Sequence, residues 1–538
     1  MTMTTQSNPS PSRELKVLTL NVWGLKYISK LREERLRSIC SLLTSTNSSY
    51  RDRYDLICLQ EIWYESKDFK YLRNSLSDLY PHSKFFLSGA FGSGLAILSK
   101  WEILEFRTNP YSLNGHPLHV HKGDWFVGKA CGSVTVHHPW LGLVDVWNTH
   151  LVGVGGETGP ESKRCHRVTQ AYELSKRCNE SAERGRHVIC AGDLNSIPPS
   201  LSIAILKDLS RMTDSFLESH PNLPAHATRL PLNASAPFPS SSSSNTNRRS
   251  ASERSISELG VTCDSPLNTW SEGKKLDQTA RNGLGKRLDY ILFRGPRRRA
   301  ARRRGGQELE EDEEEEEEDD DDDDERGRLR VKESKVVLTE RIPNLNVSYS
   351  DHFGLETVFE ILPLKRGGGD VVRRGSREAK ALQDHAVGGV NQSKVTQTLT
   401  SSLQALSGGL IQSRRDQRAH FLAFSSCLAA ILAILVVSAV VQGGRRDILR
   451  PFLVLLTLLF TWAATTLFYS AVVWSEWEKR TLRTMMESME SDLKRSRSNS
   501  GTLNSNPYNL PESTEEARRI QGEANRRSSG SDERLIAV

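Results

Sequence analysis

Residues 189–195 read Ile189-Cys190-Ala191-Gly192-Asp193-Leu194-Asn195, a short apolar run that ends in polar side chains. The run Val188–Ala191 predicts a buried strand. Asp193 and Asn195 fall on the same side of an extended segment, because side chains alternate along a strand. A carboxylate at the end of a buried strand is costly unless it is paired or binds a cation. This stretch therefore predicts a strand that carries polar groups to a site.

Other predicted strands end in the same way. The polar residues at their ends are Asn21 after Leu18-Thr19-Leu20, Glu61 after Leu56-Ile57-Cys58-Leu59-Gln60, His150 after Val144-Asp145-Val146-Trp147-Asn148-Thr149, and the pair Asp351 and His352 before Phe353-Gly354. Each is ordinary by itself, since a single strand-end His is more often structural and a single Glu can form a surface ion pair. Together, two histidines, three carboxylates and two amides suit metal-assisted hydrolysis, and a hard carboxylate such as Glu61 suits Mg²⁺.

Leu15–Ile361 alternates short β-rich runs with helical periodicity, a pattern typical of an α+β or α/β domain. The strand candidates are too numerous for one comfortable sheet. Two sheets packed face to face accommodate them better, with outer helices at Lys30–Leu43 and Glu161–Cys178. The predicted architecture is an α+β β-sandwich of four layers.

Composition divides the chain further. Residues 1–14 are expected to be disordered, and residues 15–365 to form the catalytic domain. Two inserts interrupt that domain, a Ser-rich one at about 235–257 and an Arg-then-acidic one at about 297–328. Neither can bury a core, so both are expected to be disordered loops. The acidic insert is either a solvated spacer or a regulatory element.

Two apolar stretches, 421–441 and 452–474, are each close to the roughly 20 residues that cross a bilayer. They predict a transmembrane hairpin within 420–475, preceded by a polar linker at 366–419 and followed by a disordered cytosolic tail at 476–538. Arginine and lysine are more abundant on the outer flanks than in the connecting loop, which favours cytosolic ends. A buried hairpin of a soluble domain is the alternative, although few soluble helices are apolar on every face.

The totals exclude several classes of protein. The net charge of +6 is the remainder of large, segregated charge blocks. Eight scattered cysteines contain no C-x-x-C pair, which indicates a reduced, cytosol-facing domain. The polar N-terminus lacks the apolar core of a secretory signal. No basic face interleaved with aromatic residues stands out, so nucleic acid is not an expected partner.

The sequence resembles the DNase I-like superfamily of endonucleases, exonucleases and phosphatases. The matching elements are LNVWG, LQEIW, NTHL, AGDLN, RLDYIL and SDHFGLE, spread from Asn21 to Glu356. LNVWGL, the segment from His166 to Leu174 and the segment from Gly123 to Ser133 are similar to neutral sphingomyelinases. Fungal inositol phosphosphingolipid phospholipases C are the most similar group, and they share two C-terminal membrane spans.

The resemblance implies a role for each matching residue. Glu61 matches the Mg²⁺ ligand, with Asn21 beside it, and Mn²⁺ is an alternative ion. His352 matches the general base, oriented by Asp351 or a neighbour.

Asn195 and His150 match groups that hold the phosphoryl oxygens, and Asp193 supports the histidine or metal network. The proton for the leaving group would come from a protonated His150 or from a water on the metal. Asp289 matches a further polar position. Asp124 and Lys129 match a switch that clears the site, although a surface ion pair is the ordinary alternative.

The implied substrate is a sphingolipid in a membrane, either sphingomyelin or inositol phosphoceramide, which is cleaved to ceramide and a phosphorylated headgroup. Anionic phospholipid is an expected activator because arginines flank the hairpin. The resemblance favours the endoplasmic reticulum, with the mitochondrial outer membrane and plasma membrane as alternatives. Rival functions are a nuclease, an inositol polyphosphate phosphatase, or an inactive lipid-binding tether.

Overall fold

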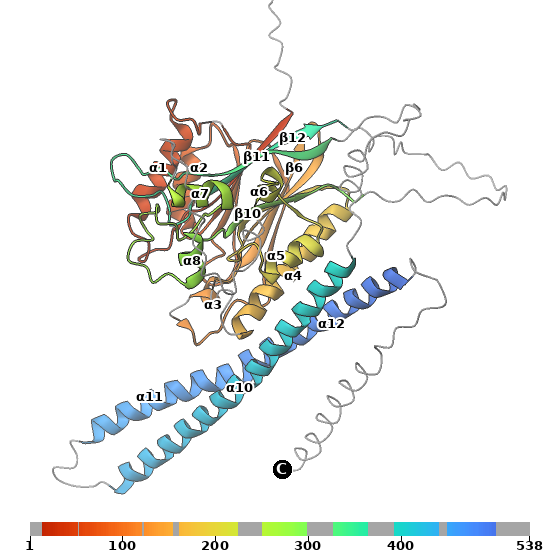
Figure 1. The fold of residues 1–538 in the computed structure, drawn as a ribbon. Helices are drawn as coiled ribbons and strands as arrows, with labels where there is room; N and C mark the ends of the chain where they lie inside the picture. The colour runs from red at the N-terminus through yellow and green to blue at the C-terminus, as the bar shows by residue number, and fades with distance from the viewer. Residues whose placement is uncertain are drawn as a thin grey trace, which may run out of the picture.

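Two mixed β-sheets packed face to face form the centre of the protein (Figure 1). The computed structural model describes residues 13–51, 53–120, 123–153, 161–223, 250–297, 327–363, 392–440 and 449–501. Sheet A has the strand order β11-β12-β1-β2-β4-β3, and sheet B has the order β5-β6-β7-β8-β10-β9.

The strands of sheet A are β1 (Glu14–Asn21), β2 (Leu56–Gln60), β3 (His82–Phe86), β4 (Leu95–Ser99), β11 (Arg328–Val337) and β12 (Gly354–Leu362). The strands of sheet B are β5 (Ile103–Pro110), β6 (Ala130–His138), β7 (Gly142–His150), β8 (His187–Asp193), β9 (Thr213–Asp214) and β10 (Asp289–Arg294). The helices of the catalytic domain are α1 (Arg32–Thr44), α2 (Lys70–Ser75), α3 (Asp124–Val127), α4 (Glu161–Glu183), α5 (Leu201–Asp208), α6 (Ser215–Ser219), α7 (Ala251–Leu259) and α8 (Gln278–Gly283), with a π-helical turn at Glu65–Phe69.

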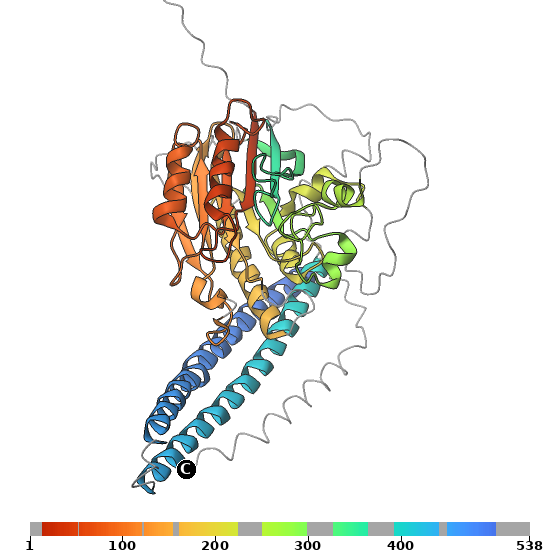
Figure 2. The same ribbon diagram turned by 90° about the vertical axis from the view of Figure 1, so that its left-hand side faces the viewer.

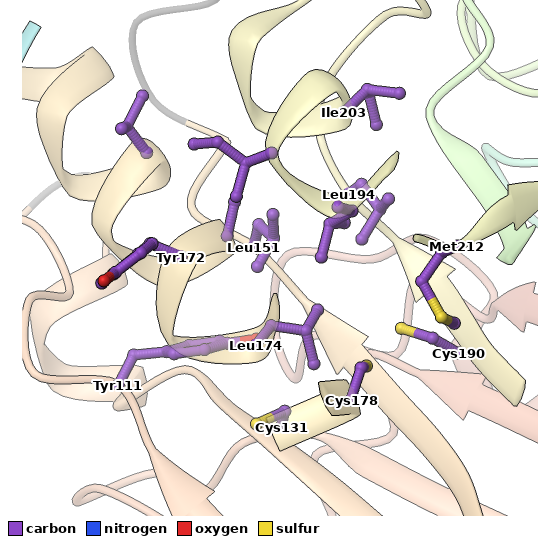
Figure 3. Close-up of a cluster of buried hydrophobic side chains, with 14 of the residues drawn as sticks. Tyr111, Cys131, Leu151, Tyr172, Leu174, Cys178, Cys190, Leu194, Ile203 and Met212 are labelled. Atoms are coloured by element: carbon purple, nitrogen blue, oxygen red, sulfur yellow. The ribbon is translucent and has the colours of Figure 1, made fainter. Parts of the chain in front are cut away.

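Alternation along the strands divides the apolar side chains between layers. On β1, Leu15 and Val17 enter the core between the sheets, whereas Leu18 and Leu20 lie in the cluster that includes α1. On β8, Ile189 faces the other sheet, while neighbouring positions join the cluster beneath α4 and α5. Figure 3 shows part of the cluster beneath α4 and α5, where α4 side chains lie over sheet B. The predicted four-layer sandwich and its two outer helices are confirmed.

The region after the catalytic domain is more ordered than its composition predicts. Helix α10 runs unbroken from Gln392 to Val440, and α11 (Arg450–Tyr469) continues through a π-helical turn (Ser470–Trp474) into α12 (Ser475–Gly501). The first half of α10 lies against α4 and beside α12 (Figures 1 and 2). Side chains of α12 reach α4, as in the hydrogen bond from Tyr172 to Asp492.

The disorder predicted for the start of the tail is therefore wrong, and the predicted polar linker contains a helix. The linker predicted at 366–419 is helical from Gln392, and the tail predicted at 476–538 is helical as far as Gly501. The N-terminal half of α10 and helix α12 are polar overall but bury a narrow stripe at helical spacing. The stripe residues are Leu399, Ser402, Ala405, Leu406 and Gly409 on α10, and Leu482, Met489 and Leu493 on α12. The mean hydropathy of such a stretch stays low because only one face of the helix is packed, so composition alone does not reveal the buried stripe.

The first insert is also shorter than predicted at its C-terminal end. Helix α7 starts within the range predicted as disordered. Its N-terminus carries a capping box in which the Ser250 and Glu253 side chains bond each other's backbone N–H. The predictions for 1–12, 224–249, 298–326, 364–391 and 502–538 lie outside the described residues.

The hairpin helices are long and apolar enough to cross a membrane, and their apolar windows are almost entirely exposed. Leu432 on α10 and Leu458 on α11 are each 63% exposed. Figure 2 shows the paired helices extending away from the catalytic domain. A buried core hairpin is therefore ruled out for these segments, because a core helix has its apolar face covered.

Leucine-to-alanine substitutions distinguish the part of the C-terminal helices that packs on the catalytic domain from the exposed apolar part. Leu482→Ala removes a fully buried side chain between α12 and the catalytic domain, so we expect a loss of about 2–5 kcal/mol of stability. The matched Leu432→Ala changes an exposed position on the apolar half of α10 and should leave the catalytic domain unaffected. Thermal unfolding of the full chain in detergent measures both, and equal midpoints would contradict this packing.

Candidate active site

Strand register brings three polar residues together on sheet B. His150, the last residue of β7, pairs with Asp193 of β8 in a parallel register, and Asp193 pairs with Asp289 of β10 in an antiparallel register. Asp289 was predicted with an uncertain role. These three residues thus occupy one row at one edge of the sheet, although they are far apart in the chain.

Sheet A contributes its polar strand ends to the same place. The Asn21 side-chain amide donates to the Glu61 carboxylate and to the Asp193 carboxylate, both at 3.1 Å. Its Oδ1 accepts the backbone N–H of Trp23. In this orientation Asn21 presents its nitrogen to the two carboxylates and positions them, and the metal role predicted for it stays a prediction.

His352 is held by Asp289. Its Nδ1 lies 2.8 Å from the Asp289 Oδ2, and its Nε2 lies 3.8 Å from the Asp193 Oδ2. Burial opposes the charged imidazole, but Cys263 and the carboxylates of Asp289 and Asp193 outweigh burial and raise the pKa of His352 well above its ordinary value. Neutral His352 with its proton on Nδ1 would leave Nε2 free to accept a proton.

Asp351 does not orient His352, and this part of the prediction is wrong. The Asp351 carboxylate instead pairs with Lys274 at 3.2 Å. Asp351 lies in a bend just before His352, and its side chain is directed to Lys274 and not to the neighbouring ring. Asp289, which belongs to the other sheet, holds that ring.

Lys129 lies inside the site. Its ammonium group is 2.8 Å from the His150 Nε2 and donates to the Leu151 carbonyl at 3.1 Å. Burial first, and then the charges of Lys129 and His352, lower the pKa of His150 well below its ordinary value. His150 is therefore a neutral acceptor here, which argues against a protonated His150 as the donor to a leaving group. Asp124 lies on α3 and acts on Lys129 by charge attraction.

Glu61 and Asn195 both adopt left-handed backbone conformations, with φ of 58° and 46°. Such conformations are costly for residues other than glycine and cluster at functional sites. The Asn195 N–H donates to Asp193 at 2.8 Å, and its side chain donates to the Leu151 carbonyl. Beside Glu61, a Cβ on Gly24 would lie 2.4 Å from the Glu61 carbonyl oxygen, so LNVWG requires glycine there.

Several positioning residues were missed by sequence reasoning. Arg35 of α1 is buried and donates to the carbonyls of Val22, Trp23 and Tyr349, which ties the loop after β1 to the loop before His352. No motif marks an arginine within a helix, so only its burial identifies it.

Gln60 and Asn148 form a second missed pair, which joins the two sheets. The Gln60 amide donates to the Asn148 Oδ1 at 2.8 Å, and the Asn148 amide donates to the Leu59 and Ala96 carbonyls at 2.9 Å. Each residue lies one or two positions before a site residue, inside the quoted LQEIW and NTHL elements. Their place just before Glu61 and His150 is the sequence signal that could have identified them.

The residues present fit a divalent cation. Asp193, Asp289 and His352 offer ligand atoms that all lie within 4.8 Å of one another. The Asp289 Oδ1 is buried, with no hydrogen-bond partner among the described residues. Burial, with the nearby charge of Asp351, also raises the pKa of Glu61. Buried carboxylates crowded in this way are costly without a cation, so the cluster is suited to hold a divalent metal.

Comparisons with known proteins agree with this geometry. The model of the endonuclease/exonuclease/phosphatase family matches residues 18–352, from β1 to His352. The chain belongs to this family. Within the family, it is 35% identical over 352 residues to the inositol phosphosphingolipids phospholipase C of Schizosaccharomyces pombe, a match that covers 65% of this chain and 69% of that protein.

A second family member, human sphingomyelin phosphodiesterase 2, is 36% identical over 211 residues, which covers 39% of this chain and 48% of that protein. Among solved structures, sphingomyelinase C from Streptomyces griseocarneus superposes with a TM-score of 0.39 and 16% identity, covering 65% of this chain and 99% of that one. That score is too low to assign a function.

Asp289→Asn tests which carboxylate controls His352. Removing the Asp289 charge removes a cause that raises the pKa of His352, so we expect that pKa to fall. The matched Asp351→Asn should change it much less, because Asp351 pairs with Lys274. Histidine-selective NMR titration of the metal-free protein measures both, and a larger fall in Asp351→Asn would contradict the assignment.

Asn148→Ala tests the link between the sheets. It removes the amide that donates to the Leu59 and Ala96 carbonyls and accepts from Gln60, so we expect a stability loss of about 1–3 kcal/mol. Activity should also fall, because Glu61 and His150 lose their common support. The exposed Asn74→Ala serves as control. Unchanged unfolding midpoints in Asn148→Ala would disprove a supporting role.

Proposed function

We propose that this protein is a Mg²⁺-dependent, phospholipase C-type phosphodiesterase that hydrolyses sphingolipids to ceramide and a phosphorylated headgroup. The observation that carries the proposal is the His352–Asp289 pair beside converging carboxylates. Identity to the fission yeast phospholipase over most of both chains supports the substrate class. Mg²⁺ is favoured over softer metals because Glu61, Asp193 and Asp289 are oxygen ligands, whereas an imidazole is a poor ligand for Mg²⁺.

In this proposal His352 is the general base. Its Nε2 takes a proton from water, while Asp289 holds Nδ1 and stabilises the imidazolium that forms. The water oxygen bonds to phosphorus, the bond from phosphorus to the ceramide oxygen breaks, and that oxygen takes a proton from a second water molecule in the site. The Asn195 side-chain amide and the N–H of the neutral His150 ring donate to the phosphoryl oxygens. The bound Mg²⁺ would stabilise the negative charge that develops on the phosphate.

Lys129 adds a positive charge next to these groups. Its ammonium contacts His150 in this structure, and burial lowers the pKa of Lys129. We infer that it contacts the lipid phosphate when substrate displaces it from His150. The role of Asp124 is to attract Lys129 away from that position, in keeping with the switch that the resemblance implies.

The hairpin is proposed to anchor the enzyme in a bilayer with both flanks on the side of the catalytic domain. The N-terminal half of α10 and helix α12 both pack on this domain, and the His166 Nε2 lies 2.7 Å from Glu478 of α12. This arrangement supports cytosolic ends, with the endoplasmic reticulum as the proposed organelle. Anionic phospholipids are proposed as activators through arginines near the hairpin, such as Arg414 and Arg418.

Hydrolysis assays on sphingomyelin and inositol phosphoceramide test the function. The full chain in proteoliposomes should release phosphorylated headgroup with Mg²⁺ and not with a chelator. His352→Ala should lower turnover by at least about 100-fold, whereas the exposed His137→Ala should not, and both should keep the wild-type unfolding midpoint.

Turnover that survives in His352→Ala would remove it as the base. Hydrolysis of DNA or of inositol polyphosphates without lipid cleavage would favour a nuclease or a phosphatase. An absence of any hydrolysis, with lipid binding retained, would favour the inactive tether.

A further inference from the structure

A row of aromatic rings leads from the hairpin to an exposed loop of the catalytic domain. Trp474, at the end of the second apolar stretch, lies 6.4 Å from Trp125 of α3, measured between ring centroids. Trp125 lies 4.9 Å from Phe126, and Phe126 lies 6.0 Å from Phe91. The row therefore links the membrane end of the helices to the loop between β3 and β4.

The outer end of this row faces solvent. Phe91 and Leu87 are each 65% exposed. The loop from Leu87 to Gly94 carries no charged side chain. Exposed aromatic and aliphatic side chains on an uncharged loop are a costly arrangement in water, because apolar area stays hydrated.

The loop is firmly attached to α3. The backbone N–H groups of Ala90 and Phe91 donate to the Phe126 carbonyl at 3.1 and 3.2 Å, and Ser88 donates to the Gly128 carbonyl at 2.7 Å. A Cβ on Gly89 would lie 2.4 Å from the Val127 carbonyl oxygen, so the two segments touch through their backbones. Leu87 and Phe91 are therefore held at a defined position relative to α3.

Helix α3 also leads directly into the catalytic site. Phe126 is three residues before Lys129, whose ammonium contacts His150. Figures 1 and 2 show α3 at the end of the catalytic domain nearest the hairpin. The exposed loop thus lies between the membrane helices and the site.

A bilayer fits this surface better than a protein does. Two protruding side chains are far smaller than the roughly 800 Å² per partner that a stable protein interface needs. Aromatic and aliphatic side chains without charge suit the interfacial layer of a membrane. The row continues to Trp474, at the end of a helix long and apolar enough to cross that membrane.

We propose that Leu87 and Phe91 form a second membrane contact, which enters the interfacial layer of the bilayer that the hairpin crosses. This inference rests on the proposed membrane anchorage. The contact holds the catalytic domain with the Lys129 side of its site against the lipid surface. A lipid headgroup then reaches the site without leaving the membrane.

Photo-crosslinking tests the contact directly. Benzoylphenylalanine replaces Phe91 in the full chain, reconstituted in nanodiscs that contain an alkyne-tagged phosphatidylcholine. The control positions are Phe106, which is 58% exposed on β5, and Leu458 of α11. With the same crosslinker at each position in turn, we expect lipid adducts at positions 91 and 458 and no lipid adduct at position 106.

Each result discriminates. An adduct at 458 without one at 91 would overturn the second contact and leave the anchor intact. No adduct at 458 would mean that the anchorage itself fails. A protein adduct at 91, within the chain or to a second copy, would replace the bilayer with a protein partner and overturn the proposal.

Activity gives an independent measure. Phe91→Asp should raise KM for substrate in vesicles by about tenfold, since a charge is expelled from the interface, while kcat on a water-soluble short-chain substrate stays at the wild-type value. Phe106→Asp should change neither. An unchanged KM on vesicles in Phe91→Asp, with correct folding shown by its unfolding midpoint, would refute the contact.

Discussion

A buried hydrogen bond between two amides underlies the arrangement of the site. Gln60 of sheet A donates to Asn148 of sheet B across the core, and Asn148 returns two hydrogen bonds to sheet A carbonyls. Apolar contacts alone let two sheets slide, because the hydrophobic effect has no direction. A directional bond of 2.8 Å fixes their relative position. The residues that follow, Glu61 and His150, come from different sheets and inherit that alignment.

Electrostatics then determines what the aligned residues can do. Carboxylates from both sheets converge on the Asn21 amide and on two histidines, and burial makes their mutual repulsion costly. The charges next to the two histidines differ in sign. His352 faces Asp289 and has a raised pKa, whereas His150 faces Lys129 and has a lowered one. The pKa values of the two buried histidines are therefore shifted in opposite directions, so His352 is the stronger base of the two and His150 stays neutral.

The C-terminal helices belong to the catalytic domain as much as to the hairpin. Leu399 and Leu406 of α10, with Leu482 of α12, lie in the same buried cluster as α4 and sheet B. A flexible tether would allow the site to face any direction. Helices that are continuous from the core into the apolar hairpin instead fix the direction of the site relative to it, and this rigidity gives a small exposed loop a constant position.

Local sequence determined the sandwich, the apolar hairpin and most of the site, because strand alternation, apolar length and polar strand ends are properties of neighbouring residues. Asn21, Glu61, His150, Asp193, Asn195 and His352 were all found in this way, and the structure brings them together. Tertiary structure alone decided the partners. Asp289 lies 63 residues before His352 and still displaces the adjacent Asp351. Likewise, the polar stretches in α10 and α12 are helical because one face of each packs on the catalytic domain. Pairing and burial depend on sheet register and on the neighbouring layer, and a sequence pattern contains neither.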